Sequence, residues 1–322
     1  MKIFRYPSRS AEQRVARIVN RGLVFPKKDM TAVNRICEDV RKRGDQAVIS
    51  YTRHFDSARM TIKSMPVSKK EFAEAARKVD RPFMRALNRA AANIKRFHEQ
   101  QLRRSWMQTD RRGTLLGQLI HPVEAAGVYV PGARGGQTPL VSSVLMGVIP
   151  ARVAGVKQIA MVTPPTRGGG VSPHLLVAAK KAGVDAVYKA GSAWAIAALA
   201  YGTETIPKVD VIVGPGNIYV TLAKKILAGT VGIDMIAGPS EILVIADHTA
   251  DPVFAAADLL SQAEHDESAQ SILITTDAAF GQAVENVHAV AGLFHRCGDA
   301  GQPVGQGSLG RVVKIPDGGL YQ

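Results

Sequence analysis

The sequence has little cysteine, no long apolar run and no signal-like beginning. Only Cys37 and Cys297 occur among the 322 residues, which argues against a disulfide framework. No apolar run approaches the roughly eighteen residues of a membrane-spanning helix, and the first residues lack the apolar core of a secretory signal. These absences predict a globular protein of the reducing cytoplasm. Its 322 residues are enough for two domains.

Several common catalytic motifs are also absent. The sequence has no HExxH helix, CxxC pair, Walker loop or GxSxG elbow, so standard metalloprotease, kinase-like and hydrolase functions lose their main support. A GxGxxG run with an acidic partner is missing too, and spacing alone therefore favours a dinucleotide site only weakly.

Acidic residues are scarce in the first third of the chain. Residues 1–120 hold 28 Lys and Arg against 11 Asp and Glu, whereas residues 121–322 hold 13 against 16. Much of the excess lies in helical patterns such as 69–104, where apolar residues recur mostly at three- and four-residue steps. We interpret the charges there as the solvated face of helices. Neither an aromatic-interleaved strand nor zinc-finger spacing accompanies them, so we expect no nucleic-acid partner.

From residue 127 onward, short β-branched runs alternate with helical runs. Helices are expected at 173–182, 193–201, 218–228 and 253–265. After a first run, GVYVPG, strands are expected at 158–163, 186–190, 209–213, 242–246 and 271–275. This alternation predicts right-handed βαβ crossovers and a mostly parallel, covered sheet, which is an α/β fold of the doubly wound kind.

The last part of the chain breaks this pattern. Eight glycines fall within residues 292–322, and neither helical nor strand periodicity is sustained there. The segment is expected to be mostly loop or poorly ordered tail. A brief apolar run at 311–315 is expected to form one edge strand at most.

Three loops have a composition suited to ligands. GVYVPGARGG at 127–136 and GPGN at 214–217 follow strands, and glycine lets a backbone approach a phosphate beside a helix N-terminus. AGPSE at 237–241 carries Ser240, which can orient a polar substrate. For each loop, a plain tight turn remains an equally good interpretation.

The stretch DLLSQAEHD at 258–266 loads a helix end with polar residues. Gln262 and His265 are three apart and therefore project from one helix face, where they can converge on a metal or a substrate. Ordinary polarity at a helix C-terminus explains the same pattern.

Taken in order, these blocks identify a family resemblance. GVYVPG, GPGNIYV, DLLSQAEHD, AIAALAYGTETIPKVD at 195–210 and IDMIAGPSEILVIAD at 233–247 closely resemble histidinol dehydrogenase. The resemblance extends from the N-terminal helices to about residue 290. It implies two Rossmann-like lobes, a homodimer, and NAD-dependent oxidation of the small molecule L-histidinol to L-histidine in histidine biosynthesis.

The resemblance also implies roles for particular residues. Gln262 and His265 match family residues that bind zinc and substrate, and Ser240 matches a substrate contact. Tyr129 and Asn217 match contacts to NAD. Trp194 stands where the family has a glutamine that contacts NAD, and its larger ring is expected to weaken that contact.

The family's APEHLE block, whose Glu and His act as acid and base, does not occur in this sequence. No catalytic residue is therefore assigned, the family's swapped C-terminal domain is expected to be missing, and impaired activity is expected. Two alternatives are an NAD-dependent dehydrogenase of another small polar alcohol and a non-catalytic binding module.

Four segments are expected on these grounds. Residues 1–126 are the helical part of a first lobe, 127–239 form the NAD lobe, 240–291 return to the first lobe with the zinc and substrate residues, and 292–322 are the tail.

Overall fold

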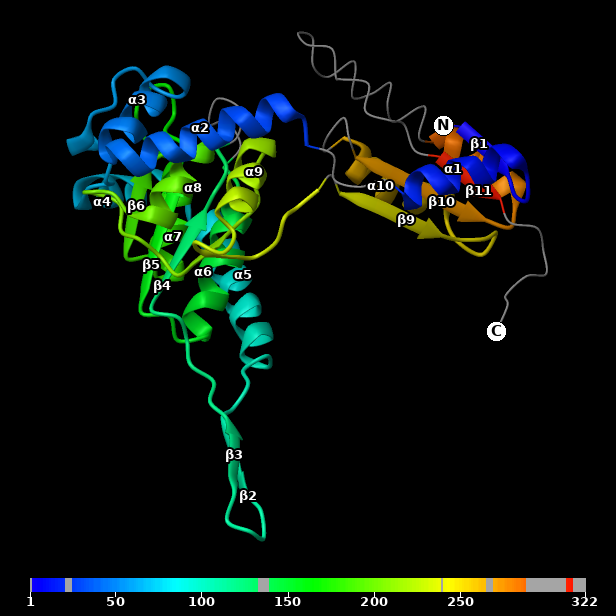
Figure 1. The fold of residues 1–322 in the computed structure, drawn as a ribbon. Coiled ribbons are helices and arrows are strands. Elements are labelled where there is room, and N and C mark those ends of the chain that lie inside the picture. The colour runs from blue at the N-terminus through cyan, green and yellow to red at the C-terminus, as the bar shows by residue number, and fades with distance from the viewer. Residues whose placement is uncertain are drawn as a thin grey trace. The chain divides into compact units, whose positions relative to one another are not determined.

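The computed structural model describes residues 2–20, 25–132, 139–238, 240–264, 269–287 and 311–314. The chain divides into two compact units, which Figure 1 shows. Unit 1 is Met1–Val24 with Gly238–Gln322, and unit 2 is Phe25–Ala237. This division differs from the expected one, because residues 25–126 belong with 127–237 and not with the segment that begins at 240. The reason is that their helices pack on the sheet of unit 2.

Unit 2 is built on a five-stranded sheet in which every neighbouring pair is parallel. The strand order is β6-β5-β4-β7-β8. The strands are β4 Ala125–Tyr129, β5 Gln158–Thr163, β6 Ala186–Lys189, β7 Val211–Val213 and β8 Gly232–Ile233. The predicted α/β class is confirmed, and because all strands are parallel, their carboxyl ends share one edge of the sheet.

Helices cover both faces of this sheet. On one face, α2 Lys27–Arg43, α8 Ser192–Tyr201 and α9 Ile218–Leu227 contribute to a core with Val162 and Ile212. On the other, α4 Lys69–Lys78, α5 Arg81–Glu99, α6 Val141–Val153 and α7 Pro173–Ala182 share a core with Val128 and Met161. Alternate residues of a strand point to opposite faces, so β4, β5, β6 and β7 each contribute side chains to both cores.

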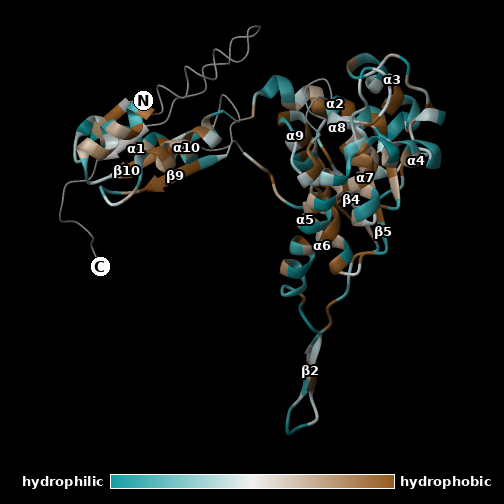
Figure 2. Ribbon diagram, turned by 180° about the vertical axis from the view of Figure 1, so that it is seen from behind, coloured by the Kyte–Doolittle hydropathy of each residue, from teal (hydrophilic) through white to brown (hydrophobic). Residues whose placement is uncertain are grey.

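The basic helices of unit 2 follow simple local rules. Asp80 caps α5 by accepting from the Phe83 N–H at 2.8 Å, and Pro82 occupies the first turn, where its missing N–H costs nothing. Leu87 and Ala91 are buried, while the Lys and Arg residues of α4 and α5 are exposed, and α4 is largely hydrophilic in Figure 2. The predicted solvated basic face is confirmed, although two apolar residues of the pattern in 69–104, Ala76 and Phe97, are also exposed.

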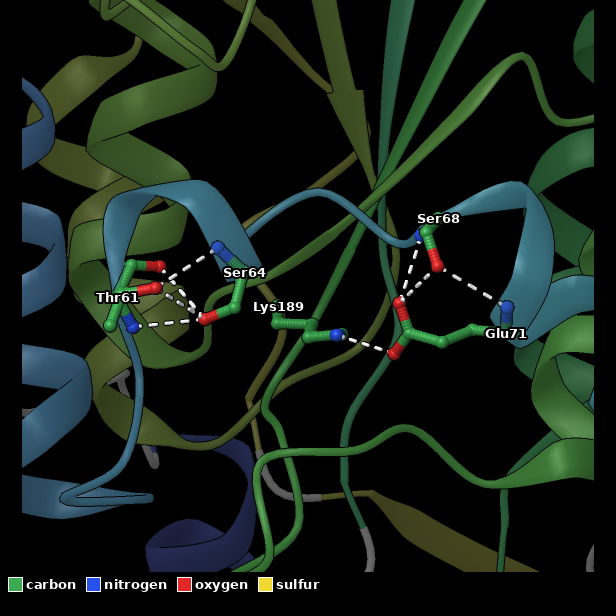
Figure 3. A network of polar contacts seen from close by, with 5 residues as sticks. All are labelled: Thr61, Ser64, Ser68, Glu71 and Lys189. Atoms are coloured by element: carbon green, nitrogen blue, oxygen red, sulfur yellow. Dashed lines mark hydrogen bonds and ion pairs between the residues drawn. The ribbon is translucent and has the colours of Figure 1, made fainter.

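An ion pair between buried Lys189 and partly exposed Glu71 links α4 to the end of β6 (Figure 3). Lys189 is 4% exposed, and its Nζ lies 2.5 Å from Oε1 of Glu71. The other Glu71 oxygen accepts from Ser68, while Ser68 Oγ accepts from the Glu71 N–H and completes a capping box. Burial by itself would raise the pKa of Glu71, but these hydrogen bonds outweigh it and hold the pKa below its usual value.

A hairpin extends away from the sheet of unit 2 (Figure 1). Its strands are β2 Trp106–Thr109 and β3 Leu115–Gln118, and every residue from 101 to 124 is exposed. The exposed large apolar side chains here are Leu102, Trp106, Met107, Leu115, Leu116, Leu119, Ile120 and Val123. A two-stranded hairpin alone is marginally stable in water, so this apolar surface favours a covering partner. The sequence patterns did not predict the hairpin.

Unit 1 contains a four-stranded parallel sheet of order β1-β11-β10-β9. Its elements are β1 Lys2–Arg5, α1 Arg9–Val19, β9 Glu241–Ile245, α10 Pro252–Ala263, β10 Gln270–Thr275 and β11 Arg311–Lys314. Leu259 of α10 packs on Leu273 in the core of this unit. The opposite side of β9, hydrophobic in Figure 2, exposes Leu243 and Ile245.

The strand expected at 311–315 forms, but it is not an edge strand. β11 pairs with β1 on one side and with β10 on the other, so its position in the sheet is internal. β1 escaped prediction because four residues carry too short a pattern. The rest of the expected tail lies outside the described residues.

The structure bears on two expectations from composition, those about cysteine and about membrane-spanning helices. Cys37 is a free thiol, and burial raises its pKa to about 12. Cys297 lies outside the described residues. Within the described part of the chain, none of the helices is both long and apolar enough to cross a membrane.

Candidate functional site

The order in which successive strands are added to the sheet of unit 2 reverses between β4 and β7. From β4 the chain builds outward through β5 and β6, and then returns to add β7 and β8 on the other side of β4. In open parallel sheets, ligands bind beyond the carboxyl ends of the strands at such a point. The glycine turn at 214–217 follows β7, and Gly214 lies against the backbone of Tyr129 at the end of β4, where the first glycine-rich loop begins. Residues 133–136 of that first loop lie outside the described residues.

Tyr129 is the last residue of β4. Its side chain is 4% exposed, and its hydroxyl oxygen accepts from the Ser192 N–H at 3.2 Å. Burial raises the pKa of Tyr129 to about 12, so the phenol keeps its proton at neutral pH. Ser192 has a φ of 48°, which is unusual for a residue with a side chain and marks stored strain where α8 begins.

Asp56 is the polar residue at this edge that the sequence analysis missed. It caps the C-terminus of α3 Asp45–Phe55, and its Oδ2 is buried without a hydrogen-bond partner among the described residues. A Cβ added to Gly191 would lie 3.4 Å from that oxygen, so the carboxyl borders the turn into α8. Burial raises the pKa of Asp56 to about 6. No motif marks Asp56, because only the packing of α3 brings it to the sheet.

We expect Asp56→Asn to raise the thermal stability near neutral pH and to leave it unchanged near pH 4. The carboxyl pKa is about 6 in the folded chain against 3.8 for a free Asp, so between these values the folded state binds more protons. The free energy of unfolding therefore falls as pH rises through this window. Melting temperatures of both proteins across the window measure the effect. A difference that does not grow with pH would contradict the assignment.

Asn217 is the N-cap of α9. Its Oδ1 accepts from the N–H groups of Tyr219 at 3.1 Å and Val220 at 3.2 Å. That oxygen therefore caps the helix. The preceding Gly214 and Gly216 press against Tyr129 and Val220, where an added Cβ would clash.

Trp194 has partners inside the protein. It lies in α8 with 4% exposure, and its Nε1 donates to Oγ1 of Thr52 at 3.1 Å. The ring stacks on Tyr51 and Phe55, with centroid separations of 5.7 and 5.5 Å. All three partners belong to α3. A cofactor contact by the Trp194 ring would therefore require α3 to move away.

The predicted zinc and substrate residues belong to unit 1. Ser240 is exposed beside β9, and its carbonyl accepts from the Gln270 N–H at 3.3 Å. Gln262 lies in the last turn of α10, and its Nε2 is buried with no hydrogen-bond partner among the described residues. His265 lies outside the described residues.

A zinc site needs more donors than the described residues supply. Zinc takes three or four protein ligands, whereas the described residues bring together no group of three His, Cys, Asp or Glu. The unpartnered Nε2 of Gln262 is a hydrogen-bond donor that suits an acceptor on a substrate, and it does not indicate a zinc ion. We therefore assign no chemical step to zinc.

A cavity of about 890 Å³ opens in unit 2 beside the turn that follows β7. Its walls include Met146 and Gly147 of α6, Val213 of β7, and the Gly214–Gly216 turn. Largely apolar pockets with a few polar groups, located at the switch point of a parallel sheet, are the usual places for small ligands.

A parallel sheet with helices on both faces and a ligand edge at the β4–β7 switch point defines a Rossmann-like α/β protein. A family model described as histidinol dehydrogenase matches residues 21–295. Histidinol dehydrogenase of Desulfotalea psychrophila is 55% identical over 267 residues, or 83% of this chain, and that of Geobacter sulfurreducens is 51% identical over 84% of it. The chain belongs to the histidinol dehydrogenase family.

A solved structure agrees with this assignment. The crystal structure of histidinol dehydrogenase from Elizabethkingia anophelis covers 98% of this chain with a TM-score of 0.86 and 37% identity. The chain spans 62% of the length of the Desulfotalea and Geobacter relatives and 71% of the Elizabethkingia chain.

Proposed function

We propose that this chain carries the NAD-binding part of a histidinol dehydrogenase together with part of its substrate side. The proposed reaction is the oxidation of L-histidinol to L-histidine in two NAD-dependent steps through an aldehyde that stays bound. The observation that carries the proposal is the glycine turn at 214–217 lying against the end of β4 at the switch point of a parallel sheet, in a chain of this family.

The NAD part rests on the shape of the carboxyl edge. Two of the four residues in the Gly214–Asn217 turn are glycines, and the N-terminus of the following α9, with its favourable dipole, lies directly after it. We assign Tyr129 and Asn217 to this cofactor site, with Asn217 acting through the N-terminus of α9, which it caps. For Trp194 we propose a supporting role, because its ring is already enclosed by α3.

The substrate part rests mainly on family membership. We assign Ser240 and Gln262 to the binding of histidinol, and Gln262 with His265 to zinc, as two members of a larger ligand set. The unpartnered Nε2 of Gln262 is a hydrogen-bond donor, so it supports an acceptor atom of a substrate near this amide and does not by itself support zinc. No acid or base is assigned, because the sequence has no APEHLE block. NAD-dependent oxidation of another small polar alcohol remains the alternative substrate assignment.

The test uses the purified chain with zinc, NAD and L-histidinol. We expect NAD to bind in a calorimetric titration, whereas NADH formation falls about a hundred- to ten-thousand-fold below that of a relative with the Glu-His pair, which is the usual contribution of positioned acid-base groups. Absence of NAD binding would overturn the proposal. NADH formation near the level of the relative would show that other residues supply the acid and base.

The same sample tests the partner that the family resemblance implies. We propose a homodimer in which the second copy covers the apolar hairpin side chains, since these are exposed in the single chain. Light scattering measures the mass of the purified protein. A monomer at all accessible concentrations would remove this part of the proposal.

A further inference from the structure

Two charged side chains hold the turn that follows β7. Lys224 of α9 is only 4% exposed, and its Nζ donates to the Gly214 carbonyl at 2.5 Å and to Oδ1 of Asp234 at 2.7 Å. The second Asp234 oxygen accepts from the Gly214 N–H at 2.8 Å. The N–H and the C=O of Gly214 are thus both bound by one ion pair.

The conformation of Gly214 needs such support. Its φ is 121°, a value that residues with a side chain rarely adopt, and an added Cβ would lie 2.1 Å from the Tyr129 carbonyl oxygen. Backbone in sparsely populated regions persists only where its surroundings hold it. Here the ion pair holds the turn from one side, and the end of β4 bounds it on the other.

The pair also borders the cavity. Lys224, Asp234 and the Gly214–Gly216 turn all line the space of about 890 Å³ beside α6. The buried charge of Lys224 is costly unless it is paired, and the partly exposed Asp234 supplies that pairing, although an apolar side chain at 224 would often serve stability equally well. The location of this pair at the ligand edge of the sheet therefore indicates a role beyond folding.

We propose that Lys224 and Asp234 are positioning residues that fix the Gly214–Asn217 turn in the conformation that receives the cofactor. The inference rests on the proposed NAD site. The pair acts through the turn, because Lys224 spends two of its donors on Gly214 and Asp234, and Asp234 also accepts from the Met235 N–H. The surface that NAD meets is then the backbone of the turn.

The test compares Lys224→Met, Asp234→Asn and the double variant with the unchanged chain. NAD affinity is measured by calorimetry well below each melting temperature, and hydrogen exchange is followed at the amides of the turn. Since a hydrogen bond to a charged group typically contributes enough to change an equilibrium about tenfold, each single variant is expected to bind NAD about tenfold more weakly. The turn amides should exchange faster than in the unchanged chain. The double variant should lose little more NAD affinity than either single variant, because both residues act on one turn.

Asp210→Asn is the matched control. Oδ2 of Asp210 accepts from the N–H groups of Glu124 and Ala125, both at 2.9 Å, at the amino end of β4, which is the opposite end of the strand from Tyr129 and the Gly214 turn. This variant is expected to lose stability while its NAD affinity stays within about twofold of the unchanged chain. A comparable loss of NAD affinity in the control would show a general structural effect and overturn the proposal.

Two further results separate the inference from the function on which it rests. Unchanged NAD affinity in folded Lys224→Met would overturn the positioning role. If the unchanged chain binds no NAD, the proposed function fails. Amide exchange then tests by itself whether Lys224 and Asp234 hold the turn. Faster exchange in both single variants supports the holding of the turn, and equal exchange overturns it.

Discussion

Replacing Trp194 by glutamine is expected to lower the free energy of unfolding by about 3 kcal/mol, in the range measured for deletion of large buried side chains. The indole is 4% exposed, and the change removes its stacking on α3 as well as the Nε1 hydrogen bond to Thr52. The glutamine amide would then be buried without the partners that it needs. Urea unfolding followed by circular dichroism measures the loss.

The other tryptophan of the chain is the control. Trp106 is 52% exposed in the hairpin, so Trp106→Gln in the isolated chain is expected to change stability by no more than about 0.5 kcal/mol. If Trp194→Gln cost as little as that, the ring would not be packed against α3.

The same variant also distinguishes two roles for this position. If Trp194 supports α3, folded Trp194→Gln binds NAD about as tightly as the unchanged chain. Clearly tighter binding would show instead that the tryptophan ring occupies the place of a cofactor contact and that α3 moves aside. Calorimetric titration of NAD into both proteins, under conditions where both are folded, separates these outcomes.

Gly214→Ala is expected to lower the free energy of unfolding by about 4 kcal/mol, because a positive φ and a steric clash each destabilise the fold by typically 1 to 3 kcal/mol. The added Cβ would lie 2.1 Å from the carbonyl oxygen of Tyr129, which is backbone and cannot swing away as a side chain does. The turn or the end of β4 must shift, so NAD affinity should fall with the stability. Chemical unfolding and calorimetry measure the two effects.

Gly229→Ala separates the steric clash from the backbone strain. Gly229 has a φ of 92°, but nothing lies within 4 Å of an added Cβ. Only the conformational cost applies, which is about 1 to 2 kcal/mol for a residue with a side chain in the left-handed region. Equal losses of unfolding free energy in Gly214→Ala and Gly229→Ala would show that the end of β4 shifts at little cost and that the contact with Tyr129 does not constrain the turn.

Local signals predicted most elements of unit 2. The helix at 173–182 was found at its observed bounds, because Pro173 starts it and Gly183, with a φ of 93°, ends it. The strand at 158–163 was also found in full, since an apolar, β-branched run between turn residues is a strong short-range pattern. The hairpin was missed because its four-residue strands are fully exposed and show no apolar alternation.

The site was only partly predictable for the same physical reason. The sequence indicated the glycine turn at 214–217 and the loop after Tyr129, because glycine and proline act on their own backbone. It did not indicate Asp56 or the pair of Lys224 and Asp234, since their environment comes from contacts between separate elements. The unusual residue Trp194 was noticed, but its neighbours in α3 are some 140 positions earlier in the chain, at a sequence separation of 142 for Thr52.

The sequence by itself determined the α/β class, the periodic elements, the basic outer faces of the N-terminal helices and the family. These depend on short-range periodicity, and on runs of residues that can be compared directly. Only the tertiary structure decided that residues 25–126 join the sheet of unit 2, that Trp194 is enclosed by α3, and that one ion pair binds both polar groups of Gly214. Burial and pairing belong to residues brought together from distant positions, and no local pattern in the chain records them.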